Sequence, residues 1–391
     1  MSSFEQAVLI VGAGAAGHGC ARALRTEGFS GPIRLINGEG AAPINRTLVD
    51  KGVLPGLLTA EQIALPPLPD VEVIDARAAR LDGTERAIVL DDGRVLRGIA
   101  VVLAPGSAPR ALDAAIAVDG AVRLHAMHAA RDAQALREAL PEPAGARLVI
   151  LGAGFIGAEV ASHFAEAGAR VTLVGRSPLP LRAALGTEIA TRLAALRAER
   201  VDARLGAEVV AIRAASAAAT PAAPSDAAIV ELADGSELTA DAVLVVVGSR
   251  PDAAWAGFDG AIAVDDRMRV EGADGVYAAG SAAAVTGGLR ADHWDAAGAQ
   301  GAHAARAVLH DLGLAEDPGP WRVTTGFTLM AHGAVVAGRG SAALGAAERP
   351  VELEGGGLIT ELTDAHGVLT GVVGWNAGPH VARAASRLGV A

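Results

Sequence analysis

The sequence of 391 residues holds a single cysteine, Cys20, so it can form neither an intrachain disulfide nor a paired-thiol redox centre. Disulfide-free chains are typical of a reducing cytoplasm, which is the compartment we expect. Positive charge is also scarce, because 33 lysines and arginines stand against 44 aspartates and glutamates, giving a net charge of −11. No run or stripe of basic residues is present, and this argues against a nucleic-acid-binding surface.

Long hydrophobic runs are missing as well. The apolar stretch 7–11 is too short for a signal peptide and ends in glycine, and no stretch approaches the ~20 apolar residues of a membrane-spanning helix. We therefore expect a soluble protein that binds no membrane. The ten histidines show no metal-ligand spacing, so we expect no metal site.

Glycine, in contrast, is abundant, and three glycines form a spaced turn near the N-terminus. Gly12, Gly14 and Gly17 follow the apolar run 8–11 and precede a helical pattern over 19–25. In a strand–turn–helix unit of this kind, the first glycine permits the turn and the second lets a pyrophosphate approach the backbone. The third lets the helix pack closely on the strand. The stretch predicts a dinucleotide-binding unit.

The same spacing returns about 140 residues later. Gly152, Gly154 and Gly157 follow the apolar run 148–151 and precede a helical pattern over 158–167. One glycine-rich turn can arise from packing alone, but two copies with matching flanks indicate two nucleotide-binding βαβ units in one chain.

The remaining pattern predicts an α/β fold with two Rossmann-like domains and a C-terminal α+β domain. Between the buried strands we expect two small antiparallel meanders, near 71–96 and 207–238, the second with a flexible low-complexity insert at 214–225. The other predicted strands are 32–37, 99–103, 170–174, 242–247, 275–280, 325–331, 351–354, 358–362 and 368–373, and the other predicted helices are 126–140, 295–312 and 379–388.

Residues after the second strand of each unit bear on nucleotide choice. Glu39 stands about twenty residues beyond the first glycines, where a carboxylate can accept hydrogen bonds from a ribose, although it can also be a solvated loop glutamate. At the matching place in the second unit stands Gly175, followed by Arg176 and Ser177. The missing acid and the arginine favour NADPH over NADH, unless Arg176 is a loop arginine without a ligand.

Several short motifs follow the glycine turns in a characteristic order. They are Leu-Ala-Pro-Gly-Ser-Ala-Pro-Arg at 103–110, Gly-Ser-Arg-Pro at 248–251, Val-Tyr-Ala-Ala-Gly at 276–280, His293-Trp294 with Gln300-Gly301, and Gly-Val-Val-Gly-Trp-Asn at 371–376. Together with the two glycine turns, and in this order, these motifs resemble the ferredoxin reductase family of two-dinucleotide-binding flavoproteins, which serve Rieske-type and plant-type ferredoxins or rubredoxins.

The resemblance implies FAD in a discontinuous domain, 1–112 with 240–318, NADPH or NADH in an insert, 113–239, and an interface domain, 319–391. Hydride would pass from the nicotinamide to the flavin, and electrons would then pass singly to an iron–sulfur carrier of the ferredoxin or rubredoxin type. The protein would act as a monomer or a homodimer.

The resemblance also implies the site residues. Lys51 would lie beside the flavin N5 edge and Glu159 would face it across the domain cleft, as a catalytic pair; alternatively, they are unrelated surface charges. The cofactor-binding residues would be Gly12, Gly14, Ala15, Ala16, Gly17, Glu39, Arg46, Lys51, Ala104, Gly106, Arg110, Gly152, Gly154, Phe155, Ile156, Gly157, Glu159, Arg176, Ser177, Gly248, Gly280, Ser281, His293 and Trp294.

The sequence departs from the family's pattern at several places. Ser281 replaces the usual aspartate on the FAD ribityl chain, segment 43–47 keeps Arg46 but loses a tyrosine, and of the aromatic cluster expected near 320–325 only Trp321 is recognisable. These departures predict weak FAD binding. They also leave open an alternative role, as a nucleotide-sensing module or as a reductase of a small molecule. A disulfide reductase is disfavoured because segment 43–51 holds no thiol.

Overall fold

The structure, a computed structural model, describes residues 6–215, 220–221, 225–285, 290, 292–322, 326–341 and 345–388. Most of the predicted flexible insert, and Thr325 of a predicted strand, lie outside these residues. The chain forms two compact units, each discontinuous in sequence. The first unit comprises 1–45, 61–108 and 249–327, and the second comprises 46–60, 109–248 and 328–391.

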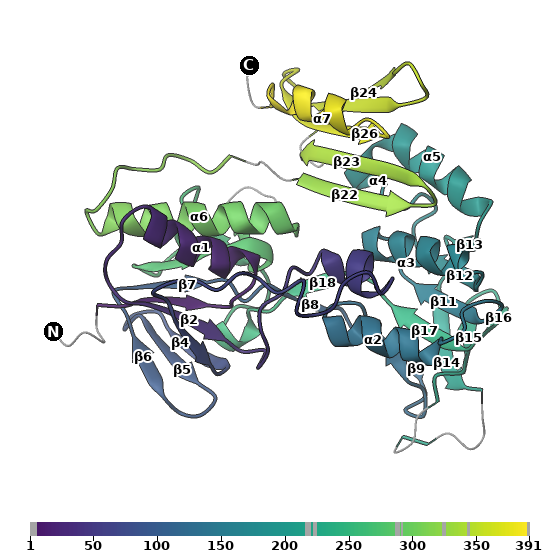
Figure 1. The fold of residues 1–391 in the computed structure, drawn as a ribbon, viewed down its shortest axis with the longest axis horizontal. Helices are drawn as coiled ribbons and strands as arrows, with labels where there is room; N and C mark the ends of the chain where they lie inside the picture. The colour runs from purple at the N-terminus through teal and green to yellow at the C-terminus, as the bar shows by residue number, and fades with distance from the viewer. Residues whose placement is uncertain are drawn as a thin grey trace. The chain divides into compact units, whose positions relative to one another are not determined.

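The first unit is built on a parallel sheet whose central strand leads into the first glycine turn (Figure 1). Every residue of that strand is buried, as expected for the middle of a covered parallel sheet. The strand order is β20 (Val276–Ala278), β7 (Ala100–Leu103), β1 (Val8–Val11), β2 (Ile33–Asn37) and β3 (Glu72–Asp75).

Two helices of this unit, α1 (Ala15–Thr26) and α6 (Trp294–Asp311), pack closely on each other. Glycines permit the close approach: a Cβ on Gly19 would lie 2.5 Å from the carbonyl oxygen of Gly298, and one on Gly301 would lie 1.9 Å from that of Ala16. The abundant small residues of the sequence therefore let two helix backbones come together.

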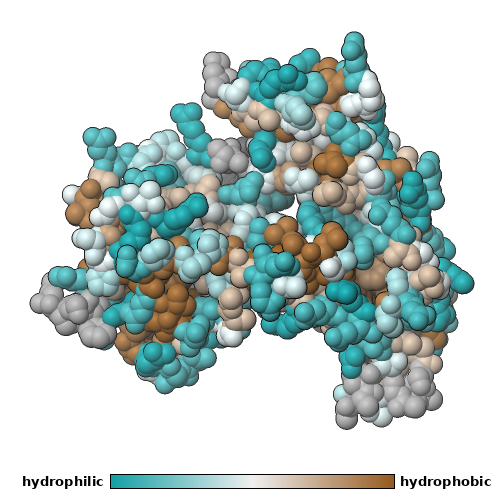
Figure 2. Space-filling model, viewed as in Figure 1, coloured by the Kyte–Doolittle hydropathy of each residue, from teal (hydrophilic) through white to brown (hydrophobic). Residues whose placement is uncertain are grey.

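The prediction for residues 71–74 was wrong in one respect. Instead of opening an antiparallel meander, these residues form β3, which pairs in parallel with β2 through Arg34 and Glu72. Strand periodicity does not reveal pairing direction, and the long connection from β2 leaves room for a crossover. The meander is instead β4 (Ala78–Asp82), β5 (Ala87–Leu90) and β6 (Val95–Arg97), over which Figure 2 shows an apolar patch.

Short elements complete the first unit. They are the strand pair β19 (Ile262–Val264) and β21 (Ala283–Val285), and the 3₁₀ turns η2 (Ala254–Ala256) and η3 (Gly280–Ala282). Two further short strands, β8 (Ser107–Pro109) and β18 (Ser249–Pro251), pair with each other.

The second unit repeats the sheet of the first, again with the glycine-turn strand in the centre. Its strand order is β10 (Leu124–His125), β17 (Ala242–Val245), β11 (Arg147–Leu151), β12 (Arg170–Gly175) and β13 (Asp202–Leu205). The antiparallel meander expected near 207–238 is present as β16 (Glu237–Ala240), β15 (Ala228–Leu232) and β14 (Val209–Ala214), with β9 (Ala117–Val118) added in parallel. Its helices are η1 (Val49–Val53, a π-helical turn), α2 (Ala130–Ala139), α3 (Phe155–Glu166), α4 (Arg182–Leu185) and α5 (Thr187–Ala198).

The C-terminal residues form the α+β element that the alternating strands predicted. One strand, β23, was missed by the sequence analysis, and helix α7 begins at Gly378. The strand order is β22 (Gly326–Ala331), β23 (Ala334–Gly340), β26 (Leu369–Trp375), β25 (Leu358–Thr363) and β24 (Ala347–Glu352), and α7 spans Gly378–Ala385.

In the part of the chain that the structure describes, no helix has both the length and the apolar character required to cross a bilayer. The three-domain division expected from sequence stays a prediction. Segment 46–60, which carries Lys51, and the C-terminal residues from 328 onward belong to the same compact unit as 109–248.

Candidate functional site

The first glycine turn has one open position between two crowded ones. Gly12 has φ +99°, and a Cβ there would lie 2.1 Å from the carbonyl oxygen of Ala104. A Cβ on Gly17 would lie 1.8 Å from the oxygen of Gly12, whereas one on Gly14 would meet no atom within 4 Å. Gly12 and Gly17 are therefore required by packing, and Gly14 leaves its backbone accessible to a ligand.

The second turn has the same geometry. Gly152 has φ +116°, and a Cβ there would lie 2.3 Å from the carbonyl oxygen of Val246. A Cβ on Gly157 would lie 1.9 Å from the oxygen of Gly152, and Gly154 again faces open space. The structure thus contains two turns of one design, one in each unit.

Each turn ends at a helix N-terminus where, among the described residues, the N-cap glycine makes no side-chain cap. Gly14 and Gly154 are the N-caps of α1 and α3, neither makes a side-chain cap, and neither helix has an acidic residue in its first turn. The first N–H groups of a helix have no intrahelical partner and carry the positive end of the helix dipole. Each turn therefore fits the diphosphate of a dinucleotide, with Ala15 and Ala16 opening α1 and Phe155 and Ile156 opening α3.

Other predicted FAD-site residues of the first unit lie at the ends of the parallel strands and at the start of α6. Ala104 directly follows β7, Gly106 has φ +76°, and Glu39 is exposed in the turn after β2. His293 is the N-cap residue of α6, and its ring stacks on that of Phe327 with ring centroids 5.7 Å apart. Burial lowers the pKa of His293, and Trp294 follows it as the first residue of α6.

The segment around Ser281 carries a polar network that the sequence analysis did not predict. The N–H of Gly280 donates to Oε1 of buried Gln300 at 2.8 Å, and the guanidinium of Arg290 donates to the carbonyl oxygen of Ser281 at 3.1 Å. Asp292 accepts hydrogen bonds from Arg290 and from the hydroxyl of Ser249. Ser281 therefore lies beside a positive charge, which no local sequence motif revealed.

Lys51 and Glu159 form an ion pair in the second unit. Lys51 lies on η1 and Glu159 on α3, and Lys51 Nζ is 2.7 Å from Oε2 of Glu159. The other carboxylate oxygen, Oε1, accepts the backbone N–H of Met330 at 2.8 Å. The lysine side chain is 25% exposed and the glutamate side chain only 6%. These contacts exclude the alternative of two unrelated surface charges.

A second carboxylate adds to the electrostatics of this pair. Asp50 is buried, and its Oδ1 lies 3.9 Å from Lys51 Nζ. Burial and the Asp50 carboxylate raise the pKa of Glu159, and Lys51 opposes the rise. The lysine therefore favours the charged form of Glu159, against burial and Asp50. Neither Asp50 nor the Met330 backbone was predicted to take part, because no local pattern reports a contact between distant segments.

The remaining predicted residues of the second unit lie around its sheet. Arg46 donates to the carbonyl oxygen of His128 at 2.9 Å, and the backbone N–H of Arg110 donates to Gly248 at 3.0 Å. Arg176 and Ser177 are exposed immediately after β12.

Gly175, the last residue of β12, has no room for a side chain. A Cβ on Gly175 would lie 2.9 Å from the Cβ of Ala153. An acidic side chain at this position would therefore require the glycine turn to move, so Arg176 is the first residue after β12 that can present a side chain to a ribose.

Cys20 cannot supply thiol chemistry. It is fully buried on α1, and burial raises its pKa to about 12. A thiol in this state is protonated and inert at neutral pH.

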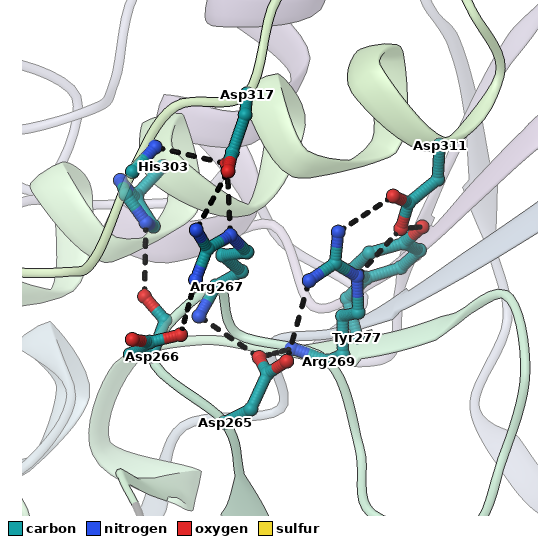
Figure 3. A network of polar contacts seen from close by, with 9 residues as sticks. Asp265, Asp266, Arg267, Arg269, Tyr277, His303, Asp311 and Asp317 are labelled. Atoms are coloured by element: carbon teal, nitrogen blue, oxygen red, sulfur yellow. Dashed lines mark hydrogen bonds and ion pairs between the residues drawn. The ribbon is translucent and has the colours of Figure 1, made fainter.

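A further polar network stabilises the first unit away from the glycine turn (Figure 3). Arg269 binds Asp311 at 2.6 Å and also Asp265, while Tyr277 donates its hydroxyl to Asp311 at 2.6 Å. Burial and the bond to Asp311 raise the pKa of Tyr277. The network connects α6 with β20.

Two repeated sheets, two uncapped glycine turns and the lysine–glutamate pair define a two-dinucleotide-binding oxidoreductase fold. The chain belongs to the pyridine nucleotide-disulphide oxidoreductase family, whose model matches residues 6–301. Within this family, ferredoxin–NAD(+) reductases use FAD and NAD(H). The fold class expected from the sequence and the resemblance to ferredoxin reductases are confirmed.

Named relatives and a solved structure agree with this assignment. The chain is 32% identical over 252 residues to the ferredoxin–NAD(+) reductase component of the p-cumate 2,3-dioxygenase system of Pseudomonas putida, covering 63% of this chain and 58% of that protein. It is 32% identical to the ferredoxin reductase component of the chlorobenzene dioxygenase of Cupriavidus sp. strain PS12, covering 83% and 80%. The ferredoxin reductase for the CYP199A2 system of Rhodopseudomonas palustris superposes with a TM-score of 0.83 at 25% identity, covering 96% and 93%. The chain spans 50–58% of the length of the first three curated relatives it matches.

Proposed function

We propose that this protein is an FAD-dependent NAD(P)H oxidoreductase that passes electrons to an iron–sulfur protein of the ferredoxin or rubredoxin type. The observation that carries the proposal is the duplicated glycine turn, with an open second glycine and an uncapped helix in each unit. Curated relatives named as ferredoxin–NAD(+) and rubredoxin–NAD(+) reductases support the acceptor. We further propose a cytoplasmic location, and a monomer or homodimer as the working form.

The first unit would hold FAD. The open backbone at Gly14 and the N-terminus of α1 would bind the diphosphate, and Glu39 would accept hydrogen bonds from the adenosine ribose. Bound flavin supplies the chemistry that joins a two-electron donor to a one-electron acceptor. The protein contributes the position of the ring and the charges around it.

The second unit would hold NAD(P)H, with the diphosphate at Gly154 and the N-terminus of α3. Glu159 lies on the same helix, five residues after Gly154, and is held by Lys51 and by the Met330 backbone. Because both carboxylate oxygens are occupied, the pair is fixed in place and can orient a nicotinamide. Hydride transfer requires no proton donor, so the pair acts by position and charge.

Anaerobic mixing of the FAD-loaded protein with NADPH or NADH tests this function. We expect the flavin absorbance to bleach, and we expect a ferredoxin or rubredoxin to restore it in one-electron steps. A matched reaction without carrier protein controls for reoxidation by small molecules. Flavin that stays oxidised at saturating nucleotide would refute the reductase and leave a nucleotide-sensing module. Recovery with quinones but not with iron–sulfur proteins would identify a small-molecule acceptor.

The nucleotide preference gives a separate prediction. Arg176→Ala should raise the KM for NADPH about tenfold and leave the KM for NADH nearly unchanged, since a charge-assisted contact to a 2′-phosphate contributes about 1.5 kcal/mol or more. Steady-state kinetics with both nucleotides measure the difference, and Arg131→Ala, at an exposed arginine of α2, serves as the control. Equal changes for both nucleotides would show that Arg176 contacts no 2′-phosphate.

The serine at position 281 gives another prediction. Ser281→Asp should tighten FAD binding about tenfold, because a carboxylate makes stronger hydrogen bonds to ribityl hydroxyls than a serine does. Ser281→Asn is the uncharged control, and titration of the apoprotein with FAD measures both. Weaker binding in the aspartate variant would indicate that Arg290, which contacts the Ser281 carbonyl, captures the new carboxylate instead.

A further inference from the structure

An arginine is buried on α5 with no hydrogen-bond partner among the residues that the structure describes. Arg197 is 1% exposed, and its Nε, Nη1 and Nη2 are all buried and unpartnered. Burial lowers the pKa of Arg197, and no carboxylate of the described residues offsets that effect. Arginines are rarely buried without a partner, because removing the charge from water is costly. This positive charge therefore needs a counter-charge from outside the described chain.

A histidine with free ring nitrogens faces the same region. His332 follows β22, is 5% exposed, and has both ring nitrogens buried and unpartnered. Burial and the charge of Arg197 lower the pKa of His332, so its ring is neutral and offers one N–H donor. Its backbone, at φ +54°, is held by a hydrogen bond from its N–H to Ser162 Oγ on α3, at 2.6 Å.

The carboxylate that acts on His332 is engaged elsewhere. Glu166, at the end of α3, accepts the hydroxyl of Ser162 at 2.9 Å and is exposed to solvent. The charge of Glu166 favours a higher pKa for His332, but neither carboxylate oxygen makes a hydrogen bond to the Arg197 guanidinium. The charge of a second arginine, Arg200, also lowers the pKa of His332, so the net charge around the His332 ring is positive.

We infer that the second unit binds a small anion of the halide class, held by the Arg197 guanidinium on α5 and the ring N–H of His332 after β22. Water would satisfy the hydrogen bonds but would leave the charge uncompensated. An anion satisfies both requirements. The site belongs to the second unit and is independent of the proposed electron transfer.

Thermal unfolding of the wild-type protein in sodium bromide, against sodium gluconate at equal ionic strength, tests the site. A ligand that binds the folded state raises Tm with its concentration, so we expect Tm to rise with each tenfold increase in bromide. Arg197→Met should abolish this rise and should be at least as stable as wild type in gluconate, because a buried charge is replaced by an apolar chain. Arg182→Met, at an exposed arginine of α4, should keep the wild-type dependence.

A crystal grown with bromide provides the direct measurement. We expect an anomalous peak beside the Arg197 guanidinium, which stays decisive even if Arg197→Met does not fold. An unchanged bromide dependence in a folded Arg197→Met, or a crystal in which water or a rotated Glu166 carboxylate occupies the position, would overturn the inference.

Discussion

Lys51→Met should lower the free energy of unfolding by about 3 kcal/mol and slow flavin reduction at least tenfold, because removing one partner of a buried ion pair leaves the other charge uncompensated. Glu159 would then remain 6% exposed, next to Asp50, and would keep the hydrogen bond from the Met330 N–H. Loss of the ion pair would also free the Glu159 side chain and weaken the orientation that we propose it gives the nicotinamide. Chemical denaturation and stopped-flow reduction measure the two effects.

The double variant Lys51→Met, Glu159→Gln separates charge from packing. We expect the double variant to recover part of the lost stability and part of the lost reduction rate, because the uncompensated carboxylate is gone. The coupling energy of this double-mutant cycle measures the direct interaction between the two side chains. Strictly additive losses would mean that the two side chains act independently.

The pH dependence of folding stability provides a further test of this ion pair. In the folded state the pKa of Glu159 is raised, and it rises further when Lys51 is removed. A carboxyl with a raised folded-state pKa binds its proton more tightly when folded, so its contribution to stability is fully present below the unfolded pKa, about 4.3. That contribution is lost as pH rises through the folded-state pKa. Lys51→Met should therefore regain stability on acidification through this window, and the double variant should not.

Two neighbouring glycines of the first turn should respond oppositely to alanine. Gly17→Ala would place a Cβ 1.8 Å from the carbonyl oxygen of Gly12, so we expect a loss of several kcal/mol or no folded protein. Gly14→Ala meets open space at φ −70°, so it should fold with nearly the wild-type Tm and lose FAD affinity instead.

Apoprotein Tm and FAD titration distinguish these outcomes. The second turn offers a matched pair, Gly157→Ala and Gly154→Ala, in which NAD(P)H affinity takes the place of FAD affinity. If Gly14→Ala binds FAD as tightly as wild type, the diphosphate does not contact this backbone, and the assignment of the turn fails.

The glycine turns were predictable from sequence because their function is local. Strand, turn and helix lie within about twenty residues, and the third glycine of each turn is constrained by the carbonyl oxygen of the first, as the contact between Gly17 and Gly12 shows. The repeated spacing then predicted both sheets and, through the resemblance, the meeting of Lys51 with Glu159.

What the sequence did not reveal depends on partners that lie far apart in the chain. Helix α5 has a weak apolar periodicity because its buried face includes Arg197, so it was missed. The direction of β3 is decided by its pairing with β2, which the residues of β3 do not specify. The bond from Met330 to Glu159 uses a backbone N–H, which every residue except proline carries, so no residue type indicates it.

The interleaving of the two units has a consequence for synthesis on the ribosome. The first unit needs residues up to 327 and the second needs residues from 46 onward, including those beyond 328, so neither is complete before most of the chain has emerged. Glu159 meets its backbone partner only after Met330 has been made, 171 residues later. Contacts of such long sequence separation slow folding and prolong the exposure of unpaired strands. Nascent chains that end near residue 240 therefore carry two incomplete sheets, and these are the species that chaperones would have to protect.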